Sequence, residues 1–178
     1  MSGGPTSIWQ IQLPSEEESS PLPGLVASYP RDVTALKCSN TGKYFVFSAN
    51  VIPGLGLAET QAQLTADKAS TVRAFTFEKL FVRHWGTWFH GERSHPFLQK
   101  VTWSNSVCTV QSSPAVDILG VGVDADVPSK PYGGSEEWSF APDDSEFAFN
   151  RRYDENSSVA WDDNLDVFTV KTSKLSSL

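Results

Sequence analysis

The chain has 178 residues, a formal net charge of −7, 39% hydrophobic residues and 12% aromatic residues. This length is enough for one domain with a core of its own, and six tryptophans favour half-buried sheet surfaces. Because an acidic protein repels a phosphate backbone, we expect no nucleic-acid partner.

The start of the chain, residues 1–6, has neither a basic segment nor an apolar run, and no stretch approaches the ~20 apolar residues that cross a bilayer. We therefore expect no signal peptide and no membrane helix. Two cysteines, Cys38 and Cys108, could form one bridge but make no disulfide framework. We expect two unpaired thiols, with Cys38 facing the core, so the cysteines leave the compartment open.

Alternating apolar and polar residues predict a strand over 7–13, with no earlier segment to pair with. An acidic connection rich in proline and serine follows over 14–24. The first β-hairpin is predicted over 33–47, with Asn40-Thr41-Gly42-Lys43 as its turn, and its second strand runs on through 48–51.

An insert follows this hairpin. Pro53-Gly54-Leu55-Gly56 ends the strand, and 57–70, which lacks glycine and proline, predicts a short helix with a thin, alanine-rich packing face. Residues 79–89 predict one continuous strand, which a turn at 90–93 connects to a return partner at 96–103.

The next stretch is less regular. Residues 104–114 are polar and predict little structure, 115–123 mix apolar residues with glycine, and 128–134 predict a loop.

A second hairpin is predicted over 138–149, with Pro142-Asp143-Asp144-Ser145 as its turn. After a polar loop over 151–163, a strand over 164–170 repeats the length and period of 7–13.

A hairpin that occurs twice predicts a repeat architecture, and units of four antiparallel strands repeated radially are propeller blades. The expected fold is therefore all-β: about two β-propeller blades with one short helical insert, in an incomplete ring, since closure needs roughly four to eight blades. The expected parts are a stray strand of a preceding blade at 7–13, a first blade at 31–103 with its insert at 53–78, and a second blade at 115–170. The alternative is a small twisted sheet or sandwich.

These residues resemble a known family. Ser39-x-x-Gly42-Lys43 and 141–145 resemble the Ser-Pro-Asp-Gly-Lys hairpin in the propeller of the prolyl oligopeptidase class of serine peptidases. Residues 80–88, Leu-Phe-Val-Arg-His-Trp-Gly-Thr-Trp, are similar to a Val-Arg-His-Trp-Asp-Thr-Trp segment in its acylaminoacyl-peptidase-like branch, which includes fungal dipeptidyl-peptidase V. Residues 130–134 and 161–168 also fit that branch. The chain departs from the family pattern at Gly86 (Asp), at Asn40-Thr41 (Pro-Asp) and at Cys38 (Trp).

The resemblance implies a two-part enzyme, in which an N-terminal propeller covers a C-terminal α/β-hydrolase domain. That domain carries a Ser-Asp-His triad, releases dipeptides from peptide N-termini, and uses no metal or organic cofactor. Peptide substrates, a secreted location, and further blades and a hydrolase domain beyond this chain are implied too. Arg83 or Glu136 would contribute where the propeller faces the active site.

No catalytic, cofactor-binding or metal-binding residue is predicted in the chain itself. The nearest match to the Gly-x-Ser-x-Gly nucleophile elbow, residues 133–137, ends in Glu and precedes a hairpin instead of a helix, which favours a structural loop. Three histidines, His84, His90 and His95, straddle a predicted strand and its turn, without Cys or carboxylate at ligand spacing.

Other polar and aromatic groups have structural interpretations. The carboxylate pairs at 143–144, 154–155 and 162–163 are expected in solvated turns. A glycosylation sequon, Asn156-Ser157-Ser158, matters only on a secretory route. Five tryptophans are expected to fill interfaces between blades, with a ligand platform as the alternative: Trp85, Trp88, Trp103, Trp138 and Trp161.

Two functions are compatible with these residues and with the resemblance. The first is a non-catalytic, substrate-gating part of the propeller of a serine-type dipeptidyl peptidase, inactive on its own. The alternative is a stand-alone β-sheet interaction module without enzymatic activity.

Overall fold

The computed structural model describes residues 5–13, 22–72, 74, 76–77, 82–111, 114–152 and 164–175. Strands dominate, and the elements in chain order are β1 (Thr6–Gln10), β2 (Gly24–Tyr29), β3 (Thr34–Cys38), β4 (Tyr44–Val51), α1 (Leu57–Ala69), β5 (Arg83–His84), β6 (Thr87–Trp88), β7 (Arg93–Ser104), β8 (Val107–Val110), β9 (Val116–Asp117), the 3-10 helix η1 (Ser135–Glu137), β10 (Trp138–Phe140), β11 (Glu146–Arg151), β12 (Asp166–Lys171) and α2 (Thr172–Leu175).

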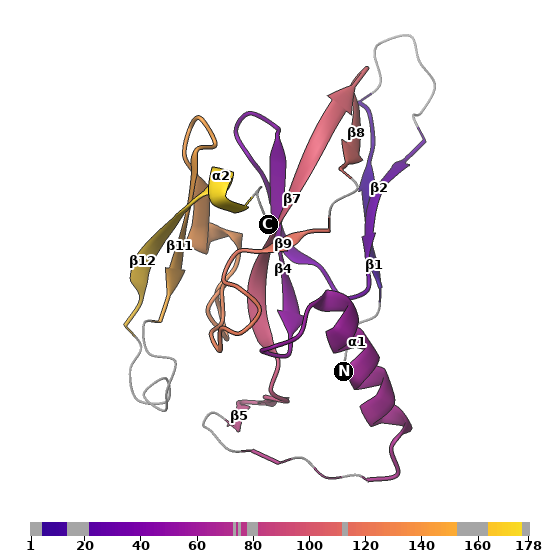
Figure 1. Cartoon of the computed structure of the whole chain (residues 1–178), viewed down its shortest axis with the longest axis vertical. Helices are drawn as coiled ribbons and strands as arrows, with labels where there is room; N and C mark the ends of the chain where they lie inside the picture. Colours follow the sequence, from indigo (N-terminus) through magenta and orange to yellow (C-terminus); the bar gives the residue numbers. More distant parts are fainter. Residues whose placement is uncertain are drawn as a thin grey trace.

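Three antiparallel sheets form the body of the molecule. The first sheet is β1-β2, the middle sheet is β3-β4-β7-β8 with β9 also paired to β7, and the third sheet is β10-β11-β12. The middle sheet lies between the other two, and β5-β6 form a small separate ladder (Figure 1). The predicted all-β class is confirmed, and none of the described sheets closes on itself.

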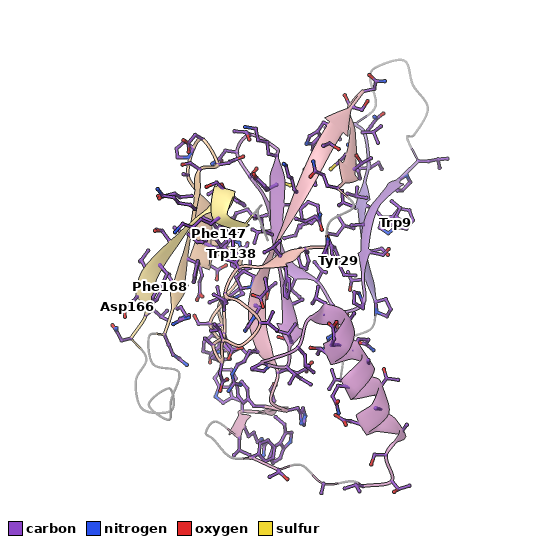
Figure 2. The ribbon with its side chains drawn as sticks, in the orientation of Figure 1. Trp9, Tyr29, Trp138, Phe147, Asp166 and Phe168 are labelled. Atoms are coloured by element: carbon purple, nitrogen blue, oxygen red, sulfur yellow. The ribbon has the colours of Figure 1, made fainter. Side chains whose placement is uncertain are left out.

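Two apolar clusters hold the three sheets together. The first cluster joins β2 to one face of the middle sheet through residues such as Tyr29, Phe47 and Phe97. The second joins the other face of the middle sheet, through Val46 and Leu98, to the third sheet. Figure 2 shows Trp138 and Phe147 in this second space. Since neighbouring residues of a strand point to opposite faces, β4 supplies both clusters, and the middle sheet is buried on both faces.

The two predicted turns have the same hydrogen bonds. In 39–44 and in 141–146, the N–H of the first residue donates to the carbonyl oxygen of the sixth, at 2.9 Å in both. The N–H of the fourth residue donates to the carbonyl oxygen of the first, at 3.1 Å and 2.9 Å respectively. That fourth residue is Gly42 with φ 72° in one turn and Asp144 with φ 60° in the other. The predicted hairpin repeat is confirmed at the level of the backbone.

The repeat extends into the next strand. The Val101 N–H donates to the Lys43 carbonyl oxygen at 2.9 Å, and the Thr172 N–H donates to the Ser145 carbonyl oxygen at 3.0 Å. In this correspondence β3-β4-β7 matches β10-β11-β12. After it, the chain continues β7 to Ser104 in one copy but enters α2 in the other.

The strand predicted over 7–13 is β1, and it is not isolated. It pairs with β2, a strand that the sequence pattern did not predict. Its residues alternate between half-buried and exposed, with Ile8 packed against the first cluster and Trp9 on the outer side. The first sheet is therefore one antiparallel pair that packs on the middle sheet by one face only.

The insert contains the predicted helix. α1 begins after Gly56 and buries only Thr60, in agreement with the thin packing face expected from its alanines. Thr60 also fixes the helix to the chain before it, because its hydroxyl accepts a bond from the Ile52 N–H at 3.1 Å. None of the helices in the described part of the chain is long and apolar enough to cross a membrane.

The continuous strand predicted over 79–89 is wrong. Residues 83–84 and 87–88 instead form the two arms of a small hairpin, and 79–81 lie outside the described residues. Trp85, with φ 48°, and Gly86 form its two-residue tip, which reverses the chain. The predicted return partner also differs, because β7 pairs with β4 along its first eight residues.

The prediction of little structure over 104–114 is also wrong. β7 and β8 form a hairpin there, connected by Asn105 and Ser106. Both residues lie in the left-handed region, with φ 49° and 63°, the backbone of a two-residue turn that suits the twist of a hairpin. A polar sequence without glycine at the turn hid this strand.

Candidate functional site

The two repeated turns contact each other across the second apolar cluster. The Asp144 carboxylate accepts hydrogen bonds from the Ser39 hydroxyl at 2.6 Å, the Asn40 N–H at 2.9 Å and the Thr41 N–H at 3.1 Å, and the Thr41 hydroxyl also donates to it. In return, the Asn40 side-chain amide donates to the Ala141 carbonyl oxygen at 3.0 Å. The turn of the third sheet is thereby fixed to the turn of the middle sheet.

Asp144 is buried, with only 3% of its surface exposed, so the expectation of a solvated turn is wrong for this residue. Burial by itself raises the pKa of its carboxyl, but the hydrogen bonds from Ser39, Thr41 and Asn40 outweigh burial and hold the pKa below its ordinary value. These bonds also offset the cost of a left-handed backbone at a residue other than glycine. The neighbouring Asp143 is exposed, as expected, and bonds Ser145.

A polar network covers the opposite end of β4. Arg31, 3% exposed, donates to the Asn50 carbonyl oxygen and to Gln61 of α1, each at 3.2 Å, and forms an ion pair with Glu92. A guanidinium group this deeply buried requires such partners. Arg31 therefore links the chain after β2 to α1 and to the start of β7.

The same network continues to the loop before η1. Arg93 pairs with Asp124 at 2.6 Å, while Lys130 pairs with Asp126 at 2.9 Å. Asp126 also accepts the Ser94 N–H at 2.7 Å. These carboxylates are occupied by protein cations and N–H groups, so the cluster is a structural brace.

Exposed aromatic rings lie beside this brace, on what we call the aromatic end surface: Arg83, Trp85, Trp88, Lys130 and Tyr132. The Arg83 guanidinium lies 5.3 Å from the centre of the Trp88 ring and donates to the Trp85 carbonyl oxygen. Trp85 and Tyr132 meet edge to face at 5.4 Å, and both remain largely exposed, at 72% and 68%. Flat rings beside cations can stack on planar groups and attract carboxylates.

The structure places Arg83 on this surface and Glu136 elsewhere. Glu136 lies in η1, directly before β10, and the described residues show no ion pair between the two. Neighbouring Glu137 accepts bonds from the Ser129 N–H and hydroxyl at 2.7 Å. The loop over 133–137 is thus tied back to Ser129, and Ser135 precedes a short 3-10 turn and a strand, without the strand-to-helix turn of a nucleophile elbow.

The three histidines have separate environments. His95 is fully buried in β7, where its Nδ1 lies 2.7 Å from Asp117 and its Nε2 lies 3.0 Å from the Val123 carbonyl oxygen. It therefore fastens the loop after β9 and does not flank a turn as expected. His90 lies before β7, and the side chain of His84 is outside the described part. No cluster of three potential metal ligands occurs among the described residues.

The tryptophans divide between core and surface. Trp138 is 2% exposed and packs 6.0 Å from Phe147, at the interface between sheets that was predicted. Trp103 is 54% exposed, and its Nε1 donates to the Gly42 carbonyl oxygen at 2.6 Å. Trp85 and Trp88 belong to the aromatic end surface, and Trp161 lies outside the described residues, as do 153–160, with Asp154, Glu155 and the sequon, and Asp162-Asp163.

Both thiols are free, as predicted. Cys108 is buried in the first cluster, and burial raises the pKa of its thiol. Cys38 is exposed, so the prediction of a core-facing position is wrong. It stands at the end of β3, an edge strand, where solvent reaches the side chain.

Comparison with known protein families, curated proteins and solved structures found no match to this chain.

Proposed function

We propose that the chain is part of the non-catalytic β-propeller of a serine peptidase of the prolyl oligopeptidase class, where it restricts access of substrates to a hydrolase domain. One observation carries the proposal: a turn-bearing hairpin recurs with the same hydrogen bonds in two successive sheets, and the sheets stack face to face. Stacked antiparallel meanders of this kind are the units of radial repetition.

The aromatic end surface supports the same proposal. The segment that most resembles the peptidase branch, 83–88, forms an exposed hairpin at the loop end of the sheets. In an intact enzyme this end would face the incoming peptide, with Arg83 and Lys130 beside its carboxylates and the rings beside its apolar side chains. The chain would then select substrates by access and contact while the chemistry took place elsewhere.

The test combines activity with the coding sequence. We expect no cleavage of fluorogenic dipeptide substrates by the isolated chain and no labelling by a fluorophosphonate probe. We also expect the coding sequence after Leu178 to continue in frame through further hairpins to a Gly-x-Ser-x-Gly motif, followed by Asp and His. Probe labelling of a serine in this chain, or a natural stop codon directly after Leu178, would contradict the proposal.

A stand-alone interaction module is the second candidate. It is favoured by the outer face of the first sheet, where Trp9 and Leu25 pair across the strands and are 58% and 56% exposed. Apolar pairs exposed in this way suit contact with another protein. A monomeric species with one cooperative thermal transition would support this candidate. Aggregation through open sheet edges would contradict it and favour the propeller fragment.

A further inference from the structure

We infer that the free edge of β12 is an acceptor site for an additional β-strand, supplied by an extended polypeptide segment with alternating apolar residues. In the described part of the chain, the third sheet ends at β12, whereas its counterpart β7 is covered along the same edge by β8 and β9. The inference rests on the internal repeat and does not depend on the peptidase proposal.

The register of the strands gives the correspondence. Lys171 lies opposite Glu146 as Lys100 lies opposite Tyr44, at the first residue after each turn. Phe168 lies opposite Phe149 as Phe97 lies opposite Phe47. Each position on β12 therefore has a known counterpart on β7.

The edge of β7 that faces away from β4 is hydrogen-bonded. The Lys100 carbonyl oxygen accepts the Gln111 N–H at 3.1 Å, and the Pro96 carbonyl oxygen accepts the Ile118 N–H at 2.9 Å. Leu98, between them, pairs with Val116 of β9. Because backbone groups of a strand alternate between its two edges, every second residue of β7 serves this outer edge.

The counterparts of these three residues on β12 are Val167, Thr169 and Lys171. Their N–H and C=O groups point away from β11, since the Thr172 N–H, one residue on, is the group that bonds the turn of the third sheet. A strand edge of this length is a template for an antiparallel partner.

The side chains define what kind of strand fits. Phe168 and Val170 face the second cluster and are only partly buried, while Val167 on the outer face is 72% exposed. An added strand would place every second side chain beside Phe168 and Val170, so apolar residues at those positions extend the cluster. On β7 the covering segment provides such residues: Cys108 is buried in the first cluster, and Val116 packs against the second.

The probe is a synthetic peptide with the sequence of residues 107–118, the segment that covers β7. Titrated against the whole chain, it should slow amide hydrogen exchange at Val167, Thr169 and Lys171 by at least about tenfold at saturation, because these amides gain hydrogen bonds. A scrambled peptide of the same composition is the control. Unchanged exchange at these amides would overturn the inference, and so would equal protection by the scrambled peptide.

Two variants of Thr169 separate a strand-addition site from other binding. Thr169→Pro removes an N–H that points to the free edge, and edge strands tolerate proline there, so peptide binding should be lost while the melting temperature is kept. Thr169→Val keeps the N–H and should keep binding. Retained binding by Thr169→Pro would overturn the inference. A dimer formed through β12 without peptide would overturn the proposed occupant. Should Thr169→Pro fail to fold, exchange in the unmodified chain still decides.

Discussion

The middle and third sheets share a turn, a register and a face, but they differ in how they end. Both place paired aromatic rings on β4 and β11, toward the preceding sheet. The middle sheet then gains β8 and β9, whereas the third sheet passes into α2 after Lys171. The comparison shows that turn chemistry and alternation are enough to repeat a hairpin, while the edge of a sheet depends on the segment that comes next in the chain.

The largest expected effect comes from the rings that both sheets bury. Phe47 in the first cluster and Phe147 in the second are 0% exposed, so Phe47→Ala or Phe147→Ala should each lower the free energy of unfolding by about 3–5 kcal/mol. Urea titration followed by tryptophan fluorescence measures this. Val167→Ala, at an exposed position, is the control and should change little. Similar losses from both phenylalanines would mean that the two clusters unfold together, and a loss confined to one transition would mean that the sheets are independent.

The contact between the two turns should be next in size. Asp144→Ala leaves the Ser39 hydroxyl and the Asn40 and Thr41 N–H groups without their acceptor, which should cost about 2–3 kcal/mol. Asp144→Asn keeps one carbonyl acceptor and should cost less. Chemical denaturation of both variants checks the order. If Asp144→Ala were as stable as the parent chain, the turn contact would contribute nothing to joining the sheets.

Acid should weaken the same contact. The pKa of Asp144 is lowered from 3.8 in the folded chain, so its contribution to stability is fully present above that pH and is lost as the pH falls through the folded-state pKa. The difference in unfolding free energy between the parent chain and Asp144→Asn should therefore be largest near neutral pH and shrink below pH 3.8. Urea titrations across this range measure the difference, and a gap independent of pH would contradict the assignment.

The smallest effect concerns left-handed turn residues. Ser106 has φ 63°, a conformation that glycine adopts without steric cost, so Ser106→Gly should raise the free energy of unfolding by a few tenths to about 1 kcal/mol. Gly42→Ala is the reverse experiment. Gly42 has φ 72°, and an added Cβ would lie 3.3 Å from the Trp103 Nε1, so stability should fall. Thermal melts of both variants would show shifts of opposite sign, and shifts of the same sign would contradict the role given to the left-handed backbone.

Local signals predicted much of the fold. Asn40-Thr41-Gly42-Lys43 and Pro142-Asp143-Asp144-Ser145 gave both turns, and the run without glycine or proline after Gly56 gave α1. The strand at 164–170 followed from alternation and is β12 in nearly the same bounds. In each case neighbouring residues supply the physical cause: a left-handed turn position, helix propensity, or period two.

Other elements could not be predicted because their cause lies far away in the chain. β2 has weak alternation and exists because it pairs with β1 and buries Tyr29 against Phe47. The aromatic end surface was missed as a surface, because 79–89 has the composition of one strand. Its reversal at Trp85-Gly86 and the contact of Trp85 with Tyr132 bring together segments distant in sequence. Exposed tryptophans next to a glycine were the only signal in the sequence.

The sequence by itself determined that this protein is a β protein with a repeated hairpin, since turns and alternation act between neighbouring residues. Only the tertiary structure decided which strands stack and which carboxylate is buried. Asp143 and Asp144 are adjacent and chemically identical, yet only Asp144 is positioned by its left-handed backbone to reach a turn in another sheet. The free edge of β12 has the same origin, because an edge is defined by the absence of a partner, which no residue in the strand encodes.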